Sequence, residues 1–281
     1  MNILEVLHQN QHMQGFTTDP ERKYMYWSFT DSVVKTNYNN TMIAQTHVTG
    51  GHLGDIAYFE GKLYASFLGN ALPGHAWDDW TAFKIYVYDA NDLHLDHIID
   101  MPICDEMKAN ACAPDDPYGF MAIDGVTFGR DTEGNTKMFV ACALFSEERF
   151  GNQIILQLSL DGEFEKRHLF PTGNQVYGIQ TLDYDWDAGE FWFTTYGGSK
   201  PFQAKETLYC IASDLKTVRA KYRYSSPYGL FCLGGGKYLA CAIGGKNGNT
   251  QGFAFECDEA WFASGKTPGE AIAELAGKST D

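Results

Sequence analysis

Short apolar runs come in pairs along this chain, and each pair alternates apolar and polar positions as a β-hairpin does. In the clearest pair, at 52–67, Ile56 and Tyr58 precede the dipeptide Glu60-Gly61, and Leu63 begins the second run. A glycine between two such runs is typical of a hairpin turn, because it readily adopts positive φ. The pattern occurs five times, which predicts hairpins at 12–29, 52–67, 123–142, 178–195 and 227–242. Five copies of one hairpin indicate a five-fold repeat.

Two further apolar segments follow most of these hairpins. Third strands are expected at 32–36, 83–88, 153–158, 208–211 and 252–255, and fourth strands at 42–48, 94–101, 167–170 and 220–224. The fifth unit has no obvious fourth strand of its own. We expect residues 3–8 to supply it, which would pair the two ends of the chain and hide exposed strand edges.

Five units of four antiparallel strands predict an all-β chain, a five-bladed β-propeller forming a single domain over 1–281. A six-bladed ring with one degenerate blade is the alternative. Near the C-terminus, Thr267-Pro268-Gly269-Glu270 has the form of a capping box with proline at the first helical position. The sequence therefore predicts a short C-terminal helix at 267–276, which we expect to cover a blade edge.

The composition limits the partners and the compartment. A net charge of −15 argues against nucleic acid and anionic membranes as partners. The N-terminus lacks the basic region and long apolar run of a signal peptide. Most of the seven cysteines lie in apolar, strand-like contexts, as buried free thiols do in a reducing compartment. We expect a cytoplasmic protein, unless a signal peptide has been removed; the oligomeric state is left open.

Polar residues recur where the innermost strands begin. Aligning the hairpins brings together six residues that are expected to converge on the mouth of the central channel: His12, Gln14, His52, Asp55, Asp124 and Gln180. Two imidazoles and two carboxylates could hold a divalent metal such as calcium, with His12, His52, Asp55 and Asp124 as ligands. They could also supply a general acid and base, with His52, Asp55 and Asp124 as the catalytic groups. A purely structural role, as hydrogen-bond partners of neighbouring blades, is the third interpretation.

The long loops offer a second set of candidates. Loops 68–81 and 102–122 are expected on the same face as the strand starts, and loops of this length are often functional. They contain Trp77, Trp80 and Tyr118, and a further loop contains Tyr196. These aromatic side chains could stack on a sugar ring or form a protein interface. Cys104 and Cys112 share the second loop and could pair or bind metal.

An acidic run in the fourth repeat, Asp183-Tyr184-Asp185-Trp186-Asp187, lacks the downstream glycine and glutamate of a calcium loop. It matches the hairpin turn of the first repeat, and we interpret it as a hairpin connection.

The strand starts His12-Met13-Gln14-Gly15, His52-Leu53-Gly54-Asp55, Ile123-Asp124-Gly125 and Ser226-Pro227-Tyr228-Gly229 resemble those of lactonase and gluconolactonase-like β-propellers. The blade count is similar to that of arabinanase-type glycosidases and calcium-dependent nucleotidases, and the chain also resembles uncharacterised bacterial propellers. The resemblance implies hydrolysis by carboxylates at the channel mouth, commonly with calcium. Asp55 and Asp124 match such positions.

These observations predict a protein that binds a small polar ligand, a carbohydrate or lactone, at the mouth of the central channel, with or without hydrolysis. Gln14 and Gln180 would orient the ligand. The alternative is a non-enzymatic scaffold that binds a protein or a sugar through loops 68–81 and 102–122.

Overall fold

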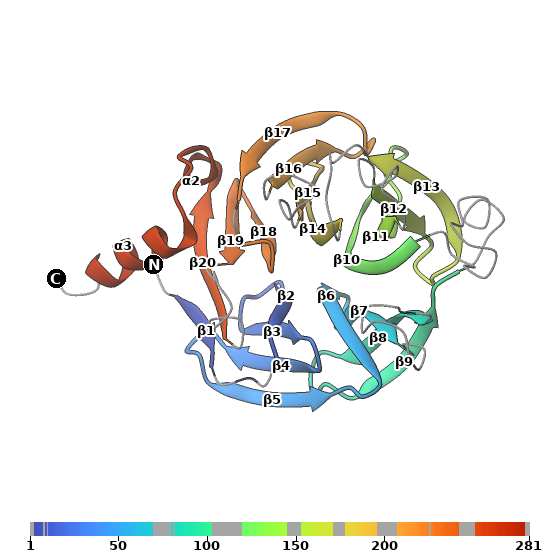
Figure 1. Cartoon of the computed structure of the whole chain (residues 1–281), viewed down its shortest axis with the longest axis horizontal. Coiled ribbons are helices and arrows are strands. Elements are labelled where there is room, and N and C mark those ends of the chain that lie inside the picture. Colours follow the sequence, from blue (N-terminus) through green and yellow to red (C-terminus); the bar gives the residue numbers. More distant parts are fainter. Residues whose placement is uncertain are drawn as a thin grey trace.

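The structure is a computed structural model. It describes residues 3–7, 9, 11–69, 80, 82–102, 120–144, 153–170, 178–195, 207–224, 226–241 and 251–278. Twenty strands form five four-stranded antiparallel sheets arranged as the blades of a ring (Figure 1). The chain is a five-bladed β-propeller. This confirms the expected fold class and decides the blade count against the six-bladed alternative.

Blades 1 to 4 each run from the channel outward in chain order. Blade 1 contains β2 (Met13–Thr18), β3 (Tyr24–Phe29), β4 (Ser32–Asn37) and β5 (Met42–His47). Blade 2 contains β6 (Gly51–Phe59), β7 (Lys62–Gly69), β8 (Ala82–Asp89) and β9 (Leu95–Asp100). Blade 3 contains β10 (Phe120–Arg130), β11 (Thr136–Leu144), β12 (Gln153–Leu158) and β13 (Phe164–Phe170). Blade 4 contains β14 (Ile179–Asp185), β15 (Glu190–Thr195), β16 (Thr207–Ala212) and β17 (Val218–Arg223).

Blade 5 is built from both ends of the chain. It contains β18 (Leu230–Gly234), β19 (Lys237–Cys241), β20 (Gly252–Asp258) and β1 (Leu4–Val6), and β1 pairs antiparallel with β20. The expected closure of the ring by the N-terminal strand is therefore confirmed. The expected turn at Glu60-Gly61 is confirmed as well, with φ of 48° and 81°.

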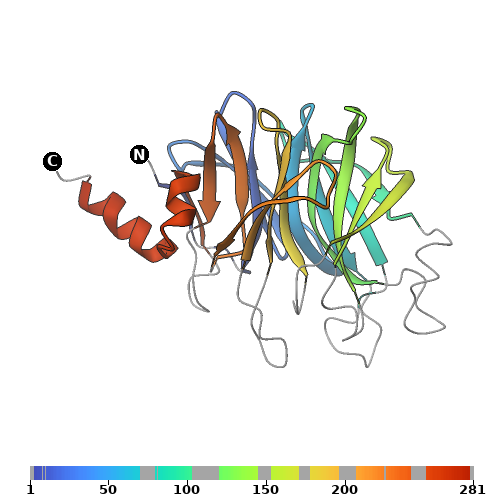
Figure 2. The same cartoon turned by 90° about the horizontal axis from the view of Figure 1, so that it is seen from above.

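Two helices follow β20 and lie outside the ring, next to blade 5 (Figure 2). They are α2 (Glu259–Ala263) and α3 (Pro268–Lys278). The sequence analysis predicted α3, and the Thr267–Glu270 capping box is present, with Thr267 N donating to Glu270 Oε2 at 2.7 Å. Helix α2 was not predicted; its Phe262 is buried against Trp192 and Tyr238. No helix in the described part of the chain is long and apolar enough to span a membrane.

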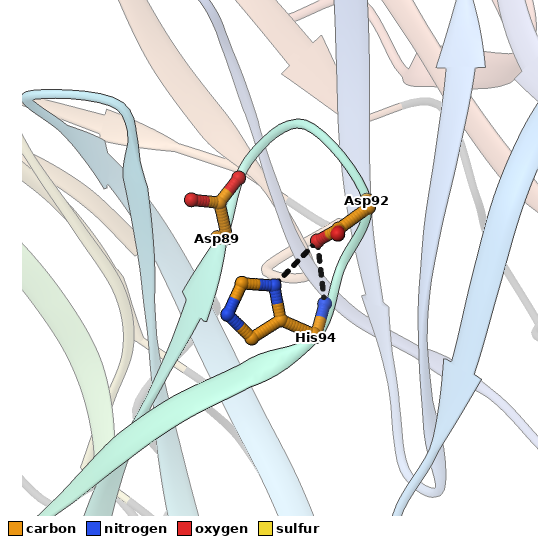
Figure 3. Close-up of side chains that lie close together, drawn as sticks. All are labelled: Asp89, Asp92 and His94. Carbon is orange, nitrogen blue, oxygen red and sulfur yellow. Dashed lines mark hydrogen bonds and ion pairs between the residues drawn. The ribbon is translucent and has the colours of Figure 1, made fainter.

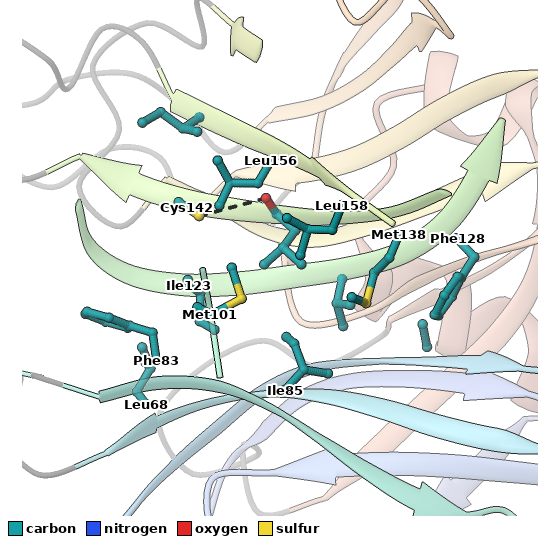
Figure 4. Packing of buried hydrophobic residues seen from close by; sticks show 14 of the residues in the cluster. Leu68, Phe83, Ile85, Met101, Ile123, Phe128, Met138, Cys142, Leu156 and Leu158 are labelled. Atoms are coloured by element: carbon teal, nitrogen blue, oxygen red, sulfur yellow. Dashed lines mark hydrogen bonds between the residues drawn. The ribbon is translucent and has the colours of Figure 1, made fainter. Parts of the chain in front are cut away.

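The hydrophobic core is divided into five clusters, one for each pair of neighbouring blades. The cluster between blades 2 and 3 brings Ile85 of β8 against Ile123 and Met138 of blade 3 (Figure 4). The cluster between blades 5 and 1 contains Leu4 and Val6 of β1. Because each blade is sandwiched between two clusters, all five inner strands are fixed around one axis.

Replacing Leu4 with alanine should lower the free energy of unfolding by about 2–5 kcal/mol, because it removes a buried side chain that helps close the ring. Leu4 is 3% exposed, whereas Met42 on the outer strand β5 is 55% exposed. Urea denaturation measures the change. Met42→Ala is the matched control and should stay within about 0.5 kcal/mol of wild type. An unchanged Leu4→Ala would show that β1 does not hold the ring together.

Candidate functional site

His12, Gln14 and His52 meet at the end of the channel where the inner strands begin. Gln14, on β2, is buried, and its Nε2 lies 3.0 Å from His12 Nε2 and 3.1 Å from His52 Nε2. His12 Nδ1 lies 3.1 Å from the carbonyl oxygen of Met13, which can only accept, so Nδ1 carries the proton of this ring. Gln14 Nε2 also donates to Thr30 Oγ1 at 3.1 Å, so its two hydrogens are shared among three acceptors, two of which are the Nε2 atoms. Both rings are then neutral, each with its proton on Nδ1.

Burial keeps the two histidines uncharged. It lowers the pKa of His12 below its ordinary value, against an opposing hydrogen bond to Met13. Burial and, second, the neighbouring His12 ring lower the pKa of His52 to about 4. Near neutral pH the pair therefore offers hydrogen-bonding groups without charge, which suits an uncharged polar ligand better than an ionic one.

His52 has one hydrogen-bonding atom to spare. Its Nδ1 is buried and has no hydrogen-bond partner among the described residues. A contact between the ring and the backbone of His52 itself opposes the lowering of the pKa. An unpaired buried donor costs about 1–3 kcal/mol, so a ligand oxygen that accepts from it would gain that energy back.

Aromatic rings stand beside both histidines. The ring centroid of Trp80 lies 6.2 Å from that of His52, and the centroid of Tyr228 lies 5.8 Å from that of His12. The two histidine rings are 6.2 Å apart and nearly perpendicular. This end of the channel thus combines neutral polar groups with aromatic surface, as small-molecule sites commonly do.

Asp55 and Asp124 form a second group, deeper in the channel. Asp55 Oδ2, on β6, accepts from Leu182 N of β14 at 3.0 Å and from Val126 N of β10 at 3.4 Å. Asp124 Oδ1, on β10, accepts from Asp55 N at 3.1 Å. Two carboxylates therefore join the inner strands of blades 2, 3 and 4. These contacts support the structural interpretation of Asp55.

β-Bulges and glycines allow the two carboxylates to lie close to the neighbouring inner strands. The strand register shifts at the same level in four inner strands, at Met13/Gly15, Leu53/Ile56, Ile123/Val126 and Ile179/Thr181. A bulge turns a side chain and a backbone N–H away from the ladder. A Cβ on Gly15 would lie 2.2 Å from Asp55 Oδ1, and one on Gly54 would lie 2.3 Å from Asp124 Oδ1. Only glycine leaves room for the carboxylates.

Burial raises the pKa of both carboxyl groups well above the ordinary 3.8. For Asp55, the hydrogen bond from Leu182 opposes the rise and the nearby Asp124 adds to it. For Asp124, the hydrogen bond from Asp55 N and the side chain of Gln180 oppose it. Gln180 thus lies with the aspartates, whereas the sequence predicted a single axial group that also included His12, Gln14 and His52. Asp124 is partly exposed and Asp55 is 3% exposed, so Asp124 is the more accessible acid.

The four predicted metal ligands His12, His52, Asp55 and Asp124 do not form a group of three or more with ligand atoms close enough to share an ion. Among the described residues, Asp89, Asp92 and His94 form such a group, with ligand atoms within 4.8 Å of one another (Figure 3). Asp89 ends β8 and is half-buried, and Asp92 and His94 lie in the exposed turn between β8 and β9. Asp92 Oδ1 lies 2.7 Å from His94 Nδ1, and the ammonium group of Lys62 lies 3.5 Å from Asp89 Oδ2. A hydrogen bond from His94 and the ammonium group of Lys62 thus already offset the negative charge of these two carboxylates.

Several predicted residues lie outside the described part of the chain. Trp77, Tyr118 and Tyr196 are among them, as are Cys104, Cys112 and most of loops 68–81 and 102–122. Their roles, and the scaffold function that depends on those loops, stay predictions.

The sequence analysis missed a cavity at the opposite end of the channel. It has a volume of about 230 Å³, and the inner strands of all five blades line it. One lining residue is Asp183, in the acidic run interpreted as a hairpin connection. Burial raises the pKa of its carboxyl to about 7. A carboxylate on an inner strand was the feature of the sequence that could have indicated this cavity.

Comparison with known proteins supports the fold and leaves the activity open. No known protein family matches the chain, and no curated protein is similar to it in sequence. Glutaminyl cyclase from Myxococcus xanthus is similar in structure, with 12% identity and a TM-score of 0.50 over 90% of this chain and 92% of that chain. A chain of the nidogen/laminin complex has 10% identity and a TM-score of 0.50 over 94% of this chain and 91% of that chain. Regucalcin, a calcium-binding protein from Agrobacterium tumefaciens, has 10% identity and a TM-score of 0.49 over 88% and 90%. At these identities the likeness shows the propeller fold alone.

The buried Asp55 should give Asp55→Asn a stability advantage over wild type that grows with pH. Because the pKa is raised, the stability contributed by this carboxyl is present below about pH 3.8. It is lost as pH rises toward the pKa of the carboxyl in the folded protein. Asparagine carries no titrating proton and therefore avoids this loss. Urea denaturation from about pH 4 upward measures the difference in free energy of unfolding.

Asp214→Asn is the control of opposite sign. Hydrogen bonds from Thr217 lower the pKa of the Asp214 carboxyl, so its contribution to stability is present at high pH. This variant should lose stability relative to wild type as pH rises. An advantage of Asp55→Asn that stays constant or shrinks with pH would contradict the proposed burial of an acid at the axis.

Proposed function

We propose that the protein binds a small, uncharged polar ligand, a carbohydrate or lactone, where His12, Gln14 and His52 meet at the mouth of the channel. The observation that carries the proposal is the buried Nδ1 of His52, which lacks a partner among the described residues. A hydroxyl, ring oxygen or carbonyl of such a ligand would accept a hydrogen bond from this Nδ1. The neutral state of both histidines favours a ligand without charge.

The aromatic rings support the same class of ligand. Trp80 and Tyr228 flank the histidines and provide apolar faces beside the polar groups. A sugar ring has polar edges and apolar faces, and so matches this combination. We infer that Gln14 acts indirectly, by fixing the proton of each imidazole on Nδ1.

Hydrolysis of the bound ligand is the enzymatic form of this proposal. Asp124 would act as the acid that protonates the leaving group, because a raised pKa keeps its proton at higher pH, and the attacking water would release its proton to solvent. Asp55 would hold the strands in place, since backbone N–H groups of two other blades occupy its Oδ2.

The thiols support a cytoplasmic location as part of the proposal. The described cysteines Cys142, Cys210, Cys232, Cys241 and Cys257 are all buried and free. Free thiols in the core fit a reducing compartment. With a net charge of −15, we propose a small molecule as the partner, and neither nucleic acid nor an anionic membrane.

His52→Ala should weaken ligand binding at least about tenfold, since about 1.4 kcal/mol, within the range for a buried hydrogen bond, corresponds to that factor. Isothermal titration calorimetry with a panel of neutral monosaccharides and lactones measures the affinity. His97→Ala is the matched control, because His97 is exposed on the outer strand β9. Equal binding by wild type and His52→Ala, or no binding of any panel member, would overturn the proposed site.

In the same assay, Asp124→Asn separates binding from chemistry. If the bound compound is hydrolysed, this variant should lose turnover while retaining affinity, because the amide cannot transfer a proton to the leaving group. Retained turnover would remove Asp124 from the acid role.

Calcium was a candidate cofactor from the sequence, and regucalcin is described as a calcium-binding protein. In this chain the arrangement of donors argues against a metal at the channel: Asp55 Oδ2 faces two N–H donors, whose positive ends disfavour a cation. We therefore expect the thermal melt to be unchanged by EDTA. A lowered melting temperature together with one equivalent of calcium by elemental analysis would contradict this.

A further inference from the structure

The cavity opposite the histidine end lies on the axis of the channel. The inner strands begin near His12 and His52, and the residues that line the cavity come from their last positions. Thr18 ends β2, Phe59 ends β6, and Leu233 lies one residue before the end of β18. The two mouths of the channel are therefore separate places with different chemistry.

The walls of this cavity are aromatic. Six aromatic residues from four blades line it: Tyr58, Phe59, Phe128, Tyr184, Trp186 and Phe231. Phe59 and Phe128 stack with centroids 4.1 Å apart, which joins blades 2 and 3 at the rim. Trp186 is 43% exposed, and the Arg130 guanidinium lies 5.8 Å from the centroid of its ring. Aromatic faces carry negative potential and attract cations.

Two carboxylates and one guanidinium line the same space. Asp183 accepts from Thr127 Oγ1 and from Cys232 N, and hydrogen bonds from the Tyr184 backbone and the Cys232 thiol also favour its ionised form. Asp19 accepts from the backbone N–H groups of Lys23 and Tyr24 through Oδ1. Arg22 donates to the carbonyl oxygen of Leu233 at 2.8 Å and so ties its guanidinium to blade 5.

We propose that this cavity binds a small organic ammonium ion, held by Asp183 and enclosed by the aromatic walls. An anion would face two carboxylates against a single guanidinium that already has an acceptor. A neutral apolar ligand would further desolvate Asp183 without compensating its charge. An ammonium ion satisfies the carboxylate and the aromatic faces together, and the acidic chain attracts cations from a distance.

The protonation of Asp183 gives this binding a pH dependence. The charged or titratable groups around the carboxyl are Asp19 and Arg22 on the turn after β2, Tyr58 on β6, Cys232 on β18, and Tyr184 and Asp185 on its own strand. The Cys232 thiol is neutral, because burial raises its pKa well above the ordinary value. Asp183 itself titrates near 7. A cation binds the ionised form, so affinity should rise as pH increases through about 7, with release of a proton.

Choline is the probe for the test, and isothermal titration calorimetry is the measurement. Wild type should bind choline more tightly at about pH 8 than at about pH 6, because Asp183 loses its proton between them. Asp183→Asn keeps an acceptor for Cys232 N but removes the charge. It should weaken binding about tenfold or more and abolish the pH dependence. Trp186→Leu should weaken binding roughly 3- to 30-fold, the range of cation–π energies.

Asp131→Asn is the matched control, because Asp131 lies in an exposed hairpin turn outside the cavity. It should bind choline as wild type does. No choline binding by wild type, equal binding by Asp183→Asn, or binding of neutral glucose at this site in place of choline would overturn the proposal. The pH dependence in wild type keeps the test decisive if Asp183→Asn folds poorly.

This inference does not depend on the function proposed for the histidine end. His52→Ala should leave choline binding unchanged, and Asp183→Asn should leave carbohydrate or lactone binding unchanged. Loss of both ligands in both variants would indicate disruption of the whole channel and would overturn the assignment of two separate sites.

Discussion

The inner edges of five sheets face one narrow channel, and their backbone N–H groups must find partners there. A strand edge offers unpaired donors and acceptors, which elsewhere in proteins are covered or paired. Here two aspartates meet part of that demand: Asp55 accepts from β10 and β14, and Asp124 accepts from β6. The carboxyl oxygens accept these hydrogen bonds in place of a further strand, for which the channel axis has no room. The five apolar clusters then hold the blades at the spacing these contacts require.

The same constraint explains why polar chemistry gathers on the axis. A side chain that satisfies a neighbouring blade must lie on an inner strand and point into the channel. Such groups are desolvated, and their pKa values move away from the ordinary ones, downward for His52 and upward for Asp183. The two mouths differ in what is added: neutral imidazoles at one end, and carboxylates with aromatic walls at the other. A structural requirement thus provides the groups from which binding sites can be made.

The sequence predicts the blades well, because each hairpin combines period-two alternation with a glycine turn, as at Glu60-Gly61. It also predicts one axial group of polar residues, whereas the described contacts form two groups: the histidines with Gln14, and the aspartates with Gln180. It does not reveal the bulges that rotate Asp55 toward two other blades, since a bulge depends on pairing between strands and leaves the alternation nearly intact. The cavity around Asp183 was missed for a related reason. Its residues come from five distant segments, and only the ring brings them together. Helix α2 is so short that Asp258, which caps it, was the one local signal.

The pairing of β1 with β20 closes the ring by joining two segments that lie far apart in the sequence. Leu4 lies opposite Ala254, about 250 residues further along the chain. Bringing such distant segments together costs chain entropy before any contact repays it, and contacts of this range are associated with slow folding. Blades 1 to 4 consist of consecutive strands and can form as the chain is made, whereas blade 5 must wait for β20. The circular architecture therefore fixes an order of assembly in which β20 completes the blade that β1 began.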